Sequence, residues 1–322
     1  MHQVDPADPA TSPGHPELAQ LVRHWSEELA AWAIPDHITA AAPDSPWVLP
    51  GQVFARRADT MSAQPAGPSF ERAWHALDPP GSVLDVGSGP GAACLPLLPR
   101  ATSVAAVDAD EVMLAMLAER ATARGVSARC VLGRWPQVAA HVPAADVVTC
   151  HHVLYNVADV VPFIAELTSH ARRLVVAEIT ATHPLTSLRQ LWLDFHGLRR
   201  PDGPTADDLL AILDAMGLRP EFRRWRRPGG PDYATFAELV DVTRRRLCLR
   251  RDRSGDVADA LLGAGVDPAH PQDLGSSGRE VLSVWWNGGA QNSLLTATAD
   301  LAVRSSCCRD DRDTATTARH HP

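Results

Sequence analysis

The sequence of 322 residues contains no lysine, so all 30 of its basic residues are arginine. We attribute the absence to a GC-rich coding bias, but it also has chemical consequences. Without lysine the chain cannot use a Walker-type phosphate loop, a Schiff base or a lysine general base. Functions that depend on any of these three are excluded.

Positive charge is also in short supply. The 38 acidic residues outnumber the basic ones, which gives a formal net charge of −8 and a pI of about 5.9. This balance argues against a dedicated nucleic-acid binder, which usually carries a basic face and a high pI. Arginines still cluster at 221–228 and 244–251. We interpret the first cluster as a charged edge strand and the second as the solvated end of a helix, with RNA binding as the weaker alternative.

Features of exported, membrane-spanning and metal-binding proteins are missing too. The six cysteines form no CxxC pair, and four of them lie in apolar surroundings typical of reduced core thiols. The first residues lack the basic and apolar regions of a signal peptide, and no apolar run is long enough to span a bilayer. No HExxH or paired Cys/His spacing predicts a metal. We therefore expect a soluble, cytoplasmic protein without a metal.

The chain divides by composition into four predicted regions. Residues 1–15 and 287–322 are polar and without pattern, and we predict that both are disordered. Residues 16–77 are predicted to form a helical cap, with an amphipathic helix at 18–34 and another near 70–77 that Ser69 caps. Residues 78–286 are predicted to form the main domain, with insertions at about 183–204 and 231–275.

The main domain shows a regular alternation of apolar and helical segments. Short apolar runs at 82–87, 102–109, 128–133, 145–153 and 172–180 alternate with candidate helices at 91–99, 110–124, 135–141 and 158–171. Runs that are apolar on both faces, alternating with helices, predict an α/β fold with a parallel sheet covered on both sides. Further helices are expected at 183–198, 205–217, 233–250 and 256–265, and strands at 218–228 and 280–286.

The stretch "VLDVGSGPG" places three glycines directly after an apolar strand. Gly87, Gly89 and Ala92 formally satisfy the dinucleotide pattern. Asp108 follows 21 residues after Gly87, where it could bind ribose hydroxyls. Asp85 weighs against NAD, because a carboxylate there would repel a pyrophosphate. A ligand with positive groups would be attracted instead. S-adenosylmethionine carries an ammonium and a sulfonium, and it has no phosphate.

Four stretches together resemble the class I methyltransferases that depend on S-adenosylmethionine. They are "VLDVGSGPG", "VAAVDAD", "DVVTCHHVLYNV" and "LVVAEIT", so the resemblance covers about 69–180 well and extends weakly to 280–286. It implies a Rossmann-like, seven-stranded, mostly parallel sheet in the order 3-2-1-4-5-7-6. It also implies S-adenosylmethionine as the cofactor, with Asp85 at its methionine end and Asp108 at its ribose. The full predicted cofactor site comprises Asp85, Gly87, Ser88, Gly89, Gly91, Asp108, Ala109, Arg134, Trp135 and His151.

Two of these assignments have structural alternatives. Asp108 could cap the helix that follows it, either instead of binding ribose or at the same time. Arg134 and Trp135 stand where the family often has an acidic residue near the adenine amine, so we expect no charged contact there. Trp135 could stack on adenine or pack inward.

The acceptor of the methyl group is predicted from the loop "CHHVLYN" after the fourth strand. His151 and His152 should point to opposite sides unless the chain turns there. Either could be a general base, with Tyr155 or Asn156 as orienting groups, or both could simply line the pocket. The loop lacks the N/D-P-P-Y/F and Pro-Cys motifs of base-modifying enzymes, which favours a small-molecule acceptor. Trp192 and His196 share a helix face that could be a pocket wall or a packing surface.

The predicted function is therefore methyl transfer from S-adenosylmethionine to a small molecule. The alternatives are an NAD-dependent oxidoreductase, a cofactor-binding module without catalysis, and, more weakly, an RNA methyltransferase. The sequence leaves the oligomeric state and the identity of the acceptor open.

Overall fold

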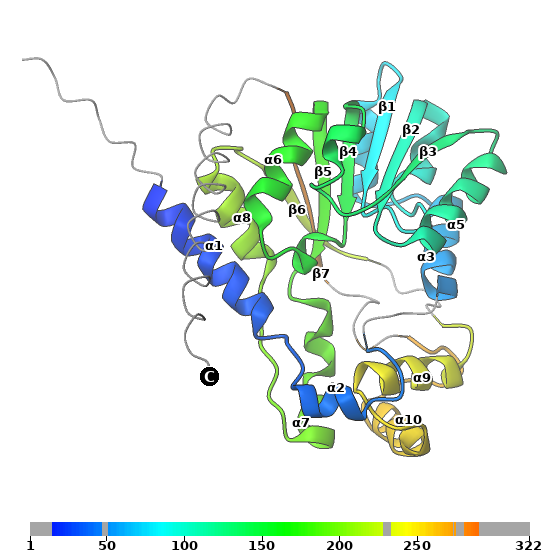
Figure 1. Ribbon diagram of the computed structural model, residues 1–322. Helices are drawn as coiled ribbons and strands as arrows, with labels where there is room; N and C mark the ends of the chain where they lie inside the picture. Colours follow the sequence, from blue (N-terminus) through cyan, green and yellow to red (C-terminus); the bar gives the residue numbers. More distant parts are fainter. Residues whose placement is uncertain (1–14, 47–50, 228–232, 273, 275–279, 290–322) are drawn as a thin grey trace, which may run out of the picture.

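A seven-stranded sheet forms the centre of the computed structural model, which describes residues 15–46, 51–227, 233–272, 274 and 280–289. The strands lie in the order β3-β2-β1-β4-β5-β7-β6, and only β7 runs antiparallel to its neighbours in the described part of the chain (Figure 1). The predicted fold class and strand order are confirmed. The predicted disordered segments, 1–15 and 287–322, lie outside the described residues except for residues 15 and 287–289.

All seven predicted strands are present, with bounds that differ by up to a few residues. They are β1 Gly81–Val86, β2 Ala101–Asp108, β3 Ala128–Leu132, β4 Ala145–His151, β5 Ala171–Thr180, β6 Glu221–Arg226 and β7 Glu280–Asn287. Strand β5 lies inside the sheet and is buried along most of its length because helices cover both faces. The arginine-rich β6 is mostly exposed at the sheet edge, in agreement with its interpretation as a charged edge strand.

Ten α-helices are described. They are α1 His15–Ala30, α2 Asp36–Ala41, α3 Gly51–Ala63, α4 Pro68–Ala76, α5 Glu111–Thr122, α6 Val160–His170, α7 Arg189–His196, α8 Ala206–Ala215, α9 Phe236–Arg246 and α10 Ser254–Gly263. The helices predicted at 91–99 and 135–141 are wrong, because each region contains only a short 3-10 helix, Leu95–Arg100 (η1) and Ala139–His141 (η2). Pro96 and Pro99 lack the backbone N–H groups that a continuing α-helix needs. Helix α3 was not predicted.

The helix caps correct two details of the sequence interpretation. Gly67 precedes α4 and Pro68 is its first residue, so Ser69 lies inside the first turn and is not the N-cap. Asp110 caps α5 by accepting hydrogen bonds from two backbone N–H groups, so the capping alternative for Asp108 is wrong. Thr205 caps α8 and forms a capping box there.

Two layers of helices cover the sheet. On one face α1, α6 and α8 pack over β-strand residues such as Val86 and Val148, with Trp25 of α1 fully buried. On the other face α4, η1 and α5 pack over residues such as Val83 and Val147. Because neighbouring strand residues face opposite ways, Asp85 lies on the same face as Val83. Helix α1 of the predicted cap packs on α8 of the predicted main domain. The division into these two regions stays a prediction.

A third group of helices lies beyond the carboxyl ends of the parallel strands. Helices α2, α7, α9 and α10 share a separate apolar cluster that includes Ile38, Trp192, Leu239 and Leu261. Figure 1 shows them gathered below the sheet, where β5 leads into α7. In open α/β sheets ligands bind at this edge, so the helix group stands over the region where a site is expected.

Candidate functional site

The glycine turn leaves β1 in a backbone conformation that side chains rarely adopt. Gly87, Gly89 and Gly91 have φ angles of +68°, +50° and +98°. A Cβ on Gly87 would lie 2.3 Å from Val153 Cγ2, and one on Gly91 would lie 2.7 Å from Leu95 Cγ. A Cβ on Gly89 would meet no described atom within 4 Å. The turn therefore leaves space beside Gly89, where a ligand can approach the backbone closely.

Asp85 carries a buried carboxylate at the end of β1. The side chain is 1% exposed, and its Oδ1 accepts a hydrogen bond of 2.8 Å from the Thr149 hydroxyl. Its Oδ2 accepts no hydrogen bond of standard geometry from the described residues, although the Cys94 thiol lies close enough to lower the pKa of Asp85. Burial raises the pKa of Asp85, although His151 and Thr149 oppose this effect. An ammonium group fits this site, because it supplies both a hydrogen bond and a positive charge.

Asp108 holds the turn from the neighbouring strand. Its Oδ2 accepts a hydrogen bond of 2.7 Å from the Gly89 N–H, and its Oδ1 accepts one of 2.9 Å from the Asp110 N–H. Each carboxylate oxygen keeps a second acceptor position, so Asp108 can still bind a ribose hydroxyl as predicted. Ser88 is buried in the turn and its N–H donates to Val107 at 3.1 Å, whereas Ala109 is exposed.

Trp135 points into the protein. Its side chain is 7% exposed, and its indole N–H donates to the Phe163 carbonyl at 3.3 Å. The ring also meets His170 edge-on, with centroids 4.8 Å apart. Of the two alternatives for Trp135 this position corresponds to inward packing, so the ring is not available to stack on adenine. Arg134, beside it, is exposed.

His151 and His152 lie where β4 ends. His151 is half-buried, and its Nε2 is a buried atom with no hydrogen-bond partner among the described residues. His152 has a φ of +60°, so the chain turns at this point and the two rings are not confined to opposite sides of an extended strand. A residue with a bulky side chain in this region of φ indicates local strain, which often marks a functional site. Burial lowers the pKa of both imidazoles.

A row of polar side chains crosses four strands on the face covered by α4. The strand register pairs Asp85 with Thr149, His151 with Glu178, and Glu178 with Ser283. Paired residues of neighbouring strands share one face of a sheet, so these five side chains form a continuous polar row. The row runs from the glycine turn on β1 across β4 to β5 and β7.

Glu178 is the buried charge at the centre of this row. It is 3% exposed, it accepts hydrogen bonds from the hydroxyls of Ser69 and Ser283, and it pairs with Arg227. Burial alone would raise the pKa of Glu178, but the positive charge of the Arg227 guanidinium holds it well below its usual range. The sequence analysis missed Glu178, Ser69 and Arg227. A charge inside the apolar run "LVVAEIT" was the available signal for Glu178.

Of the remaining predicted residues, Tyr155 lies near His152 and Trp192 lies in an apolar cluster. Tyr155 lies in the 3-10 helix Leu154–Asn156 (η3), with its ring centroid 6.3 Å from that of His152, and Asn156 is exposed. Trp192 and His196 do share a face of α7, with centroids 4.9 Å apart. Trp192 is 2% exposed within the third apolar cluster, which corresponds to the packing alternative.

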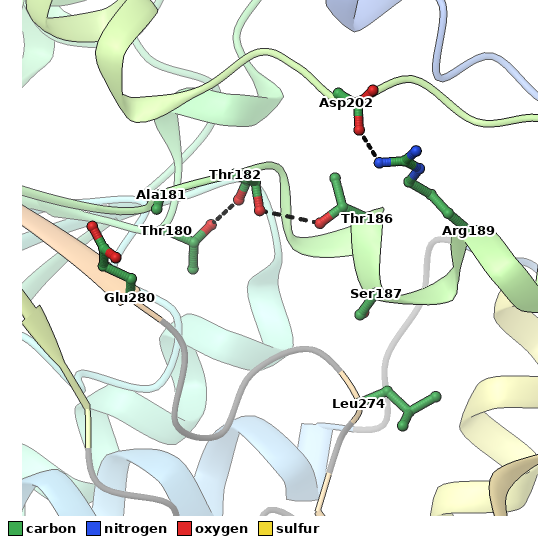
Figure 2. Close-up of a pocket in the computed structure, with 9 residues that line it drawn as sticks. All are labelled: Thr180, Ala181, Thr182, Thr186, Ser187, Arg189, Asp202, Leu274 and Glu280. Carbon is green, nitrogen blue, oxygen red and sulfur yellow. Dashed lines mark hydrogen bonds and ion pairs between the residues drawn. The ribbon is translucent and has the colours of Figure 1, made fainter. Parts of the chain in front are cut away.

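A polar pocket of about 480 Å³ opens at the end of β5 (Figure 2). Its walls are formed by Thr180, Ala181, Thr182, Thr186, Ser187, Arg189, Asp202, Leu274 and Glu280. Figure 2 shows Arg189 paired with Asp202, and Thr182 hydrogen-bonded to both Thr180 and Thr186. Among the described residues its lining includes no member of the glycine turn. Thr180 lies two residues beyond Glu178 on the same strand, so the pocket adjoins the polar row.

The described part of the chain contains neither a metal-binding cluster nor a membrane-spanning helix. It holds no group of three His, Cys, Asp or Glu side chains that could bind a metal ion. It also holds no helix that is both long and apolar enough to cross a membrane.

Residues 83–173 match the family model described as a methyltransferase domain. This segment is therefore similar to methyltransferase domains. The match begins at the strand before the glycine turn and ends within β5, so it contains Asp85, Asp108 and both histidines. The match agrees with the predicted methyltransferase family and enzyme class, and S-adenosylmethionine stays the predicted cofactor. The buried Asp85 oxygen and the open space beside Gly89 fit that cofactor.

Three solved structures are similar to parts of this chain. The YcgJ protein of Bacillus subtilis is 16% identical with a TM-score of 0.46, covering 69% of this chain and 98% of its own. Magnesium protoporphyrin IX methyltransferase of Synechocystis, solved with S-adenosylhomocysteine, is 21% identical with a TM-score of 0.41, covering 56% and 78%. The plantazolicin methyltransferase BamL is 11% identical with a TM-score of 0.44, covering 85% and 100%. These values say nothing about the acceptor of this chain. No curated protein sequence matches it.

Proposed function

We propose that this enzyme transfers the methyl group of S-adenosylmethionine to a small molecule that binds beside Glu178. The observation that carries the proposal is the polar row, which connects Asp85 at the glycine turn with the pocket at the end of β5. A cofactor site and an acceptor pocket on one edge of one sheet are what a transfer reaction requires.

The cofactor would be held by residues of the glycine turn and of the two acidic positions. Asp85 would bind the ammonium group, Asp108 a ribose hydroxyl, and Gly89 would allow close approach to the backbone. When bound, S-adenosylmethionine supplies the methyl group. The part of the protein in the reaction is to align the acceptor and to exclude water from the reacting atoms.

Two observations support a small-molecule acceptor: the volume of the pocket and the salt bridges that the clustered arginines form with acidic residues. A volume of about 480 Å³ lies within the range of pockets for organic ligands, roughly 300 to 1,000 Å³. On β6, Arg224 pairs with Asp207 and Glu280, and on α9, Arg244 pairs with Asp44 and Asp241. Arginines neutralised in this way contribute little to binding a phosphate backbone, which disfavours RNA as the acceptor.

The proposal is tested by following a labelled methyl group. The protein is incubated with methyl-labelled S-adenosylmethionine and either a low-molecular-mass cell extract or total RNA, and the label is traced by chromatography. We expect label in the small-molecule fraction together with formation of S-adenosylhomocysteine, and we expect neither with the Asp85→Asn variant. Label in RNA, or no transfer to either fraction, would contradict the proposal.

A further inference from the structure

The His152 side chain touches two charged groups through the same ring nitrogen. Its Nε2 lies 2.8 Å from Arg227 Nη2 and 3.2 Å from Glu178 Oε1. Its Nδ1 makes no hydrogen bond with any described residue, and 28% of the side chain is exposed. One edge of the ring is therefore held by Arg227 and Glu178, and part of the side chain remains exposed.

The identity of these neighbours determines which nitrogen carries the proton. A guanidinium group only donates hydrogen bonds, so Arg227 cannot accept one from His152. A proton on Nε2 could reach Glu178 Oε1 at 3.2 Å, but Arg227 Nη2 would then face, across 2.8 Å, a ring nitrogen that cannot accept its N–H. Arg227 Nη2 has two hydrogens, and the geometry provides one acceptor for each, Glu178 Oε1 and His152 Nε2. The remaining proton of the neutral ring must then be on Nδ1.

The charges around the ring favour its neutral form. Burial lowers the pKa of His152, and the positive charges of Arg227 and Arg57 lower it further. The carboxylate of Glu178 acts in the opposite direction, but it is itself paired with Arg227. Burial also lowers the pKa of His151, the last residue of β4.

We infer that Arg227 and Glu178 hold His152 as the neutral Nδ1–H tautomer, so that His152 offers the acceptor a hydrogen-bond donor and not a base. The assignment of the tautomer is independent of the reaction, whereas the role toward the acceptor rests on the proposed function. Arg227 and Glu178 are positioning residues in this arrangement. It selects acceptors that present a lone pair to His152, such as a carbonyl or carboxylate oxygen or an unprotonated heteroaromatic nitrogen. This proposed role differs from the general base predicted for His152.

The tautomer can be measured directly in the protein without ligand. Long-range ¹H–¹⁵N NMR of protein labelled at histidine nitrogen distinguishes Nδ1–H from Nε2–H rings. The His152 signal is identified by its loss in His152→Asn, which suits a positive φ and keeps an N–H donor. We expect an Nδ1–H ring for His152 at neutral pH. A proton on Nε2, or a doubly protonated ring, would overturn the inference.

A second variant tests the part played by Arg227 and supplies an independent assignment of the signal. In Arg227→Met the donor to Nε2 is gone, and we expect the proton to move to Nε2, where Glu178 can accept it. The matched control is Arg223→Met on the exposed strand β6, which should leave the His152 signal unchanged. An unchanged tautomer in Arg227→Met would show that Arg227 does not set it.

The role toward the acceptor is read from the methyl-transfer assay. His152→Asn keeps an N–H donor, so we expect it to retain transfer to within about tenfold, whereas His152→Ala should lose more than that. Loss of transfer in both variants alike would contradict a donor role. If wild-type protein transfers no methyl group at all, the proposed function fails, while the NMR result still decides the tautomer.

Discussion

Replacing Asp85 with asparagine removes one buried negative charge and preserves the shape of the side chain. The asparagine oxygen can still accept the 2.8 Å hydrogen bond from Thr149, which keeps the side chain in place. The second oxygen, which accepts no hydrogen bond of standard geometry from the described residues, becomes an NH₂ group. That group cannot accept a hydrogen bond from an ammonium, so the expected result is weaker binding of S-adenosylmethionine.

The size of the loss follows from the burial of Asp85. Two unit charges about 4 Å apart attract by roughly 4 kcal/mol at an effective dielectric constant of about 20. Removing one partner of a buried charge pair costs about 2 to 5 kcal/mol. With about 1.4 kcal/mol for each factor of ten, the affinity should fall by about 30-fold to a few thousand-fold.

The same substitution should not destabilise the free protein. Burial raises the pKa of Asp85, which means that the site disfavours the charged form when no cation is bound. Thermal unfolding should therefore show an unchanged or higher Tm for Asp85→Asn. Calorimetric titration should show a similar fall in affinity for S-adenosylmethionine and S-adenosylhomocysteine, because both carry the ammonium group and only the first carries the sulfonium.

The matched control is Asp110→Asn, a nearby carboxylate that is exposed and caps α5. Asparagine caps a helix about as well as aspartate, so neither stability nor affinity should change. Unchanged affinity in Asp85→Asn would refute the assignment of the ammonium site. An equal fall in both variants would show that the effect is not specific to Asp85.

At the glycine turn, Gly87→Ala should destabilise the protein more than Gly89→Ala in urea unfolding. A methyl at position 87 would lie 2.3 Å from Val153, whereas at position 89 it adds only backbone strain of about 1 to 2 kcal/mol; equal losses would contradict the account. Trp135→Phe should cost about 1 kcal/mol for the lost indole hydrogen bond and leave the calorimetric affinity for S-adenosylmethionine unchanged. A large fall in affinity would mean that the ring does contact the cofactor. The pKa of Glu178 is lower in the folded protein than its unfolded value of about 4.3, so its stabilising contribution is present above that pH and is lost as the pH falls through the folded-state pKa. Thermal melts of wild type and Glu178→Gln should therefore converge on acidification, and a constant difference would argue against an ionised Glu178.

The parallel strands could be predicted from the sequence because their side chains are buried on both faces. Runs such as "SVLDVG" and "RRLVVAEIT" are apolar without alternation, which is typical of a sheet covered by two layers of helices. The position of Asp85 followed from the same run, since it is the only charge directly before the glycine turn. Its unpartnered oxygen could not be predicted, because that depends on Thr149, 64 residues away.

Helix α3 shows where apolar periodicity is insufficient. Its buried residues are Val53, Ala55 and Ala58, and Arg56 and Arg57 stand between them. The helix buries small side chains and one valine, so no strong apolar stripe marks it in the sequence. Its position depends on packing against other elements, which a local pattern does not contain.

The polar site beyond Asp85 depends on strand register. Glu178 could be suspected as a charge in an apolar run, but its partner Arg227 is 49 residues away in an arginine-rich segment. Four arginines lie within 223–227, and only the alignment of β6 with β7 brings Arg227 to Glu178. The ring nitrogen of His152 that carries the proton depends on that alignment. The sequence therefore indicated His152 as a candidate site residue but not its tautomer.

Calorimetric titration of the wild-type protein tests the central claim most directly. S-adenosylmethionine, S-adenosylhomocysteine and NAD are titrated in parallel into the same preparation. The account predicts that the first two bind and that NAD does not, because the buried carboxylate of Asp85 attracts an ammonium and repels a pyrophosphate. Binding of NAD without binding of either methionine-derived ligand would contradict it.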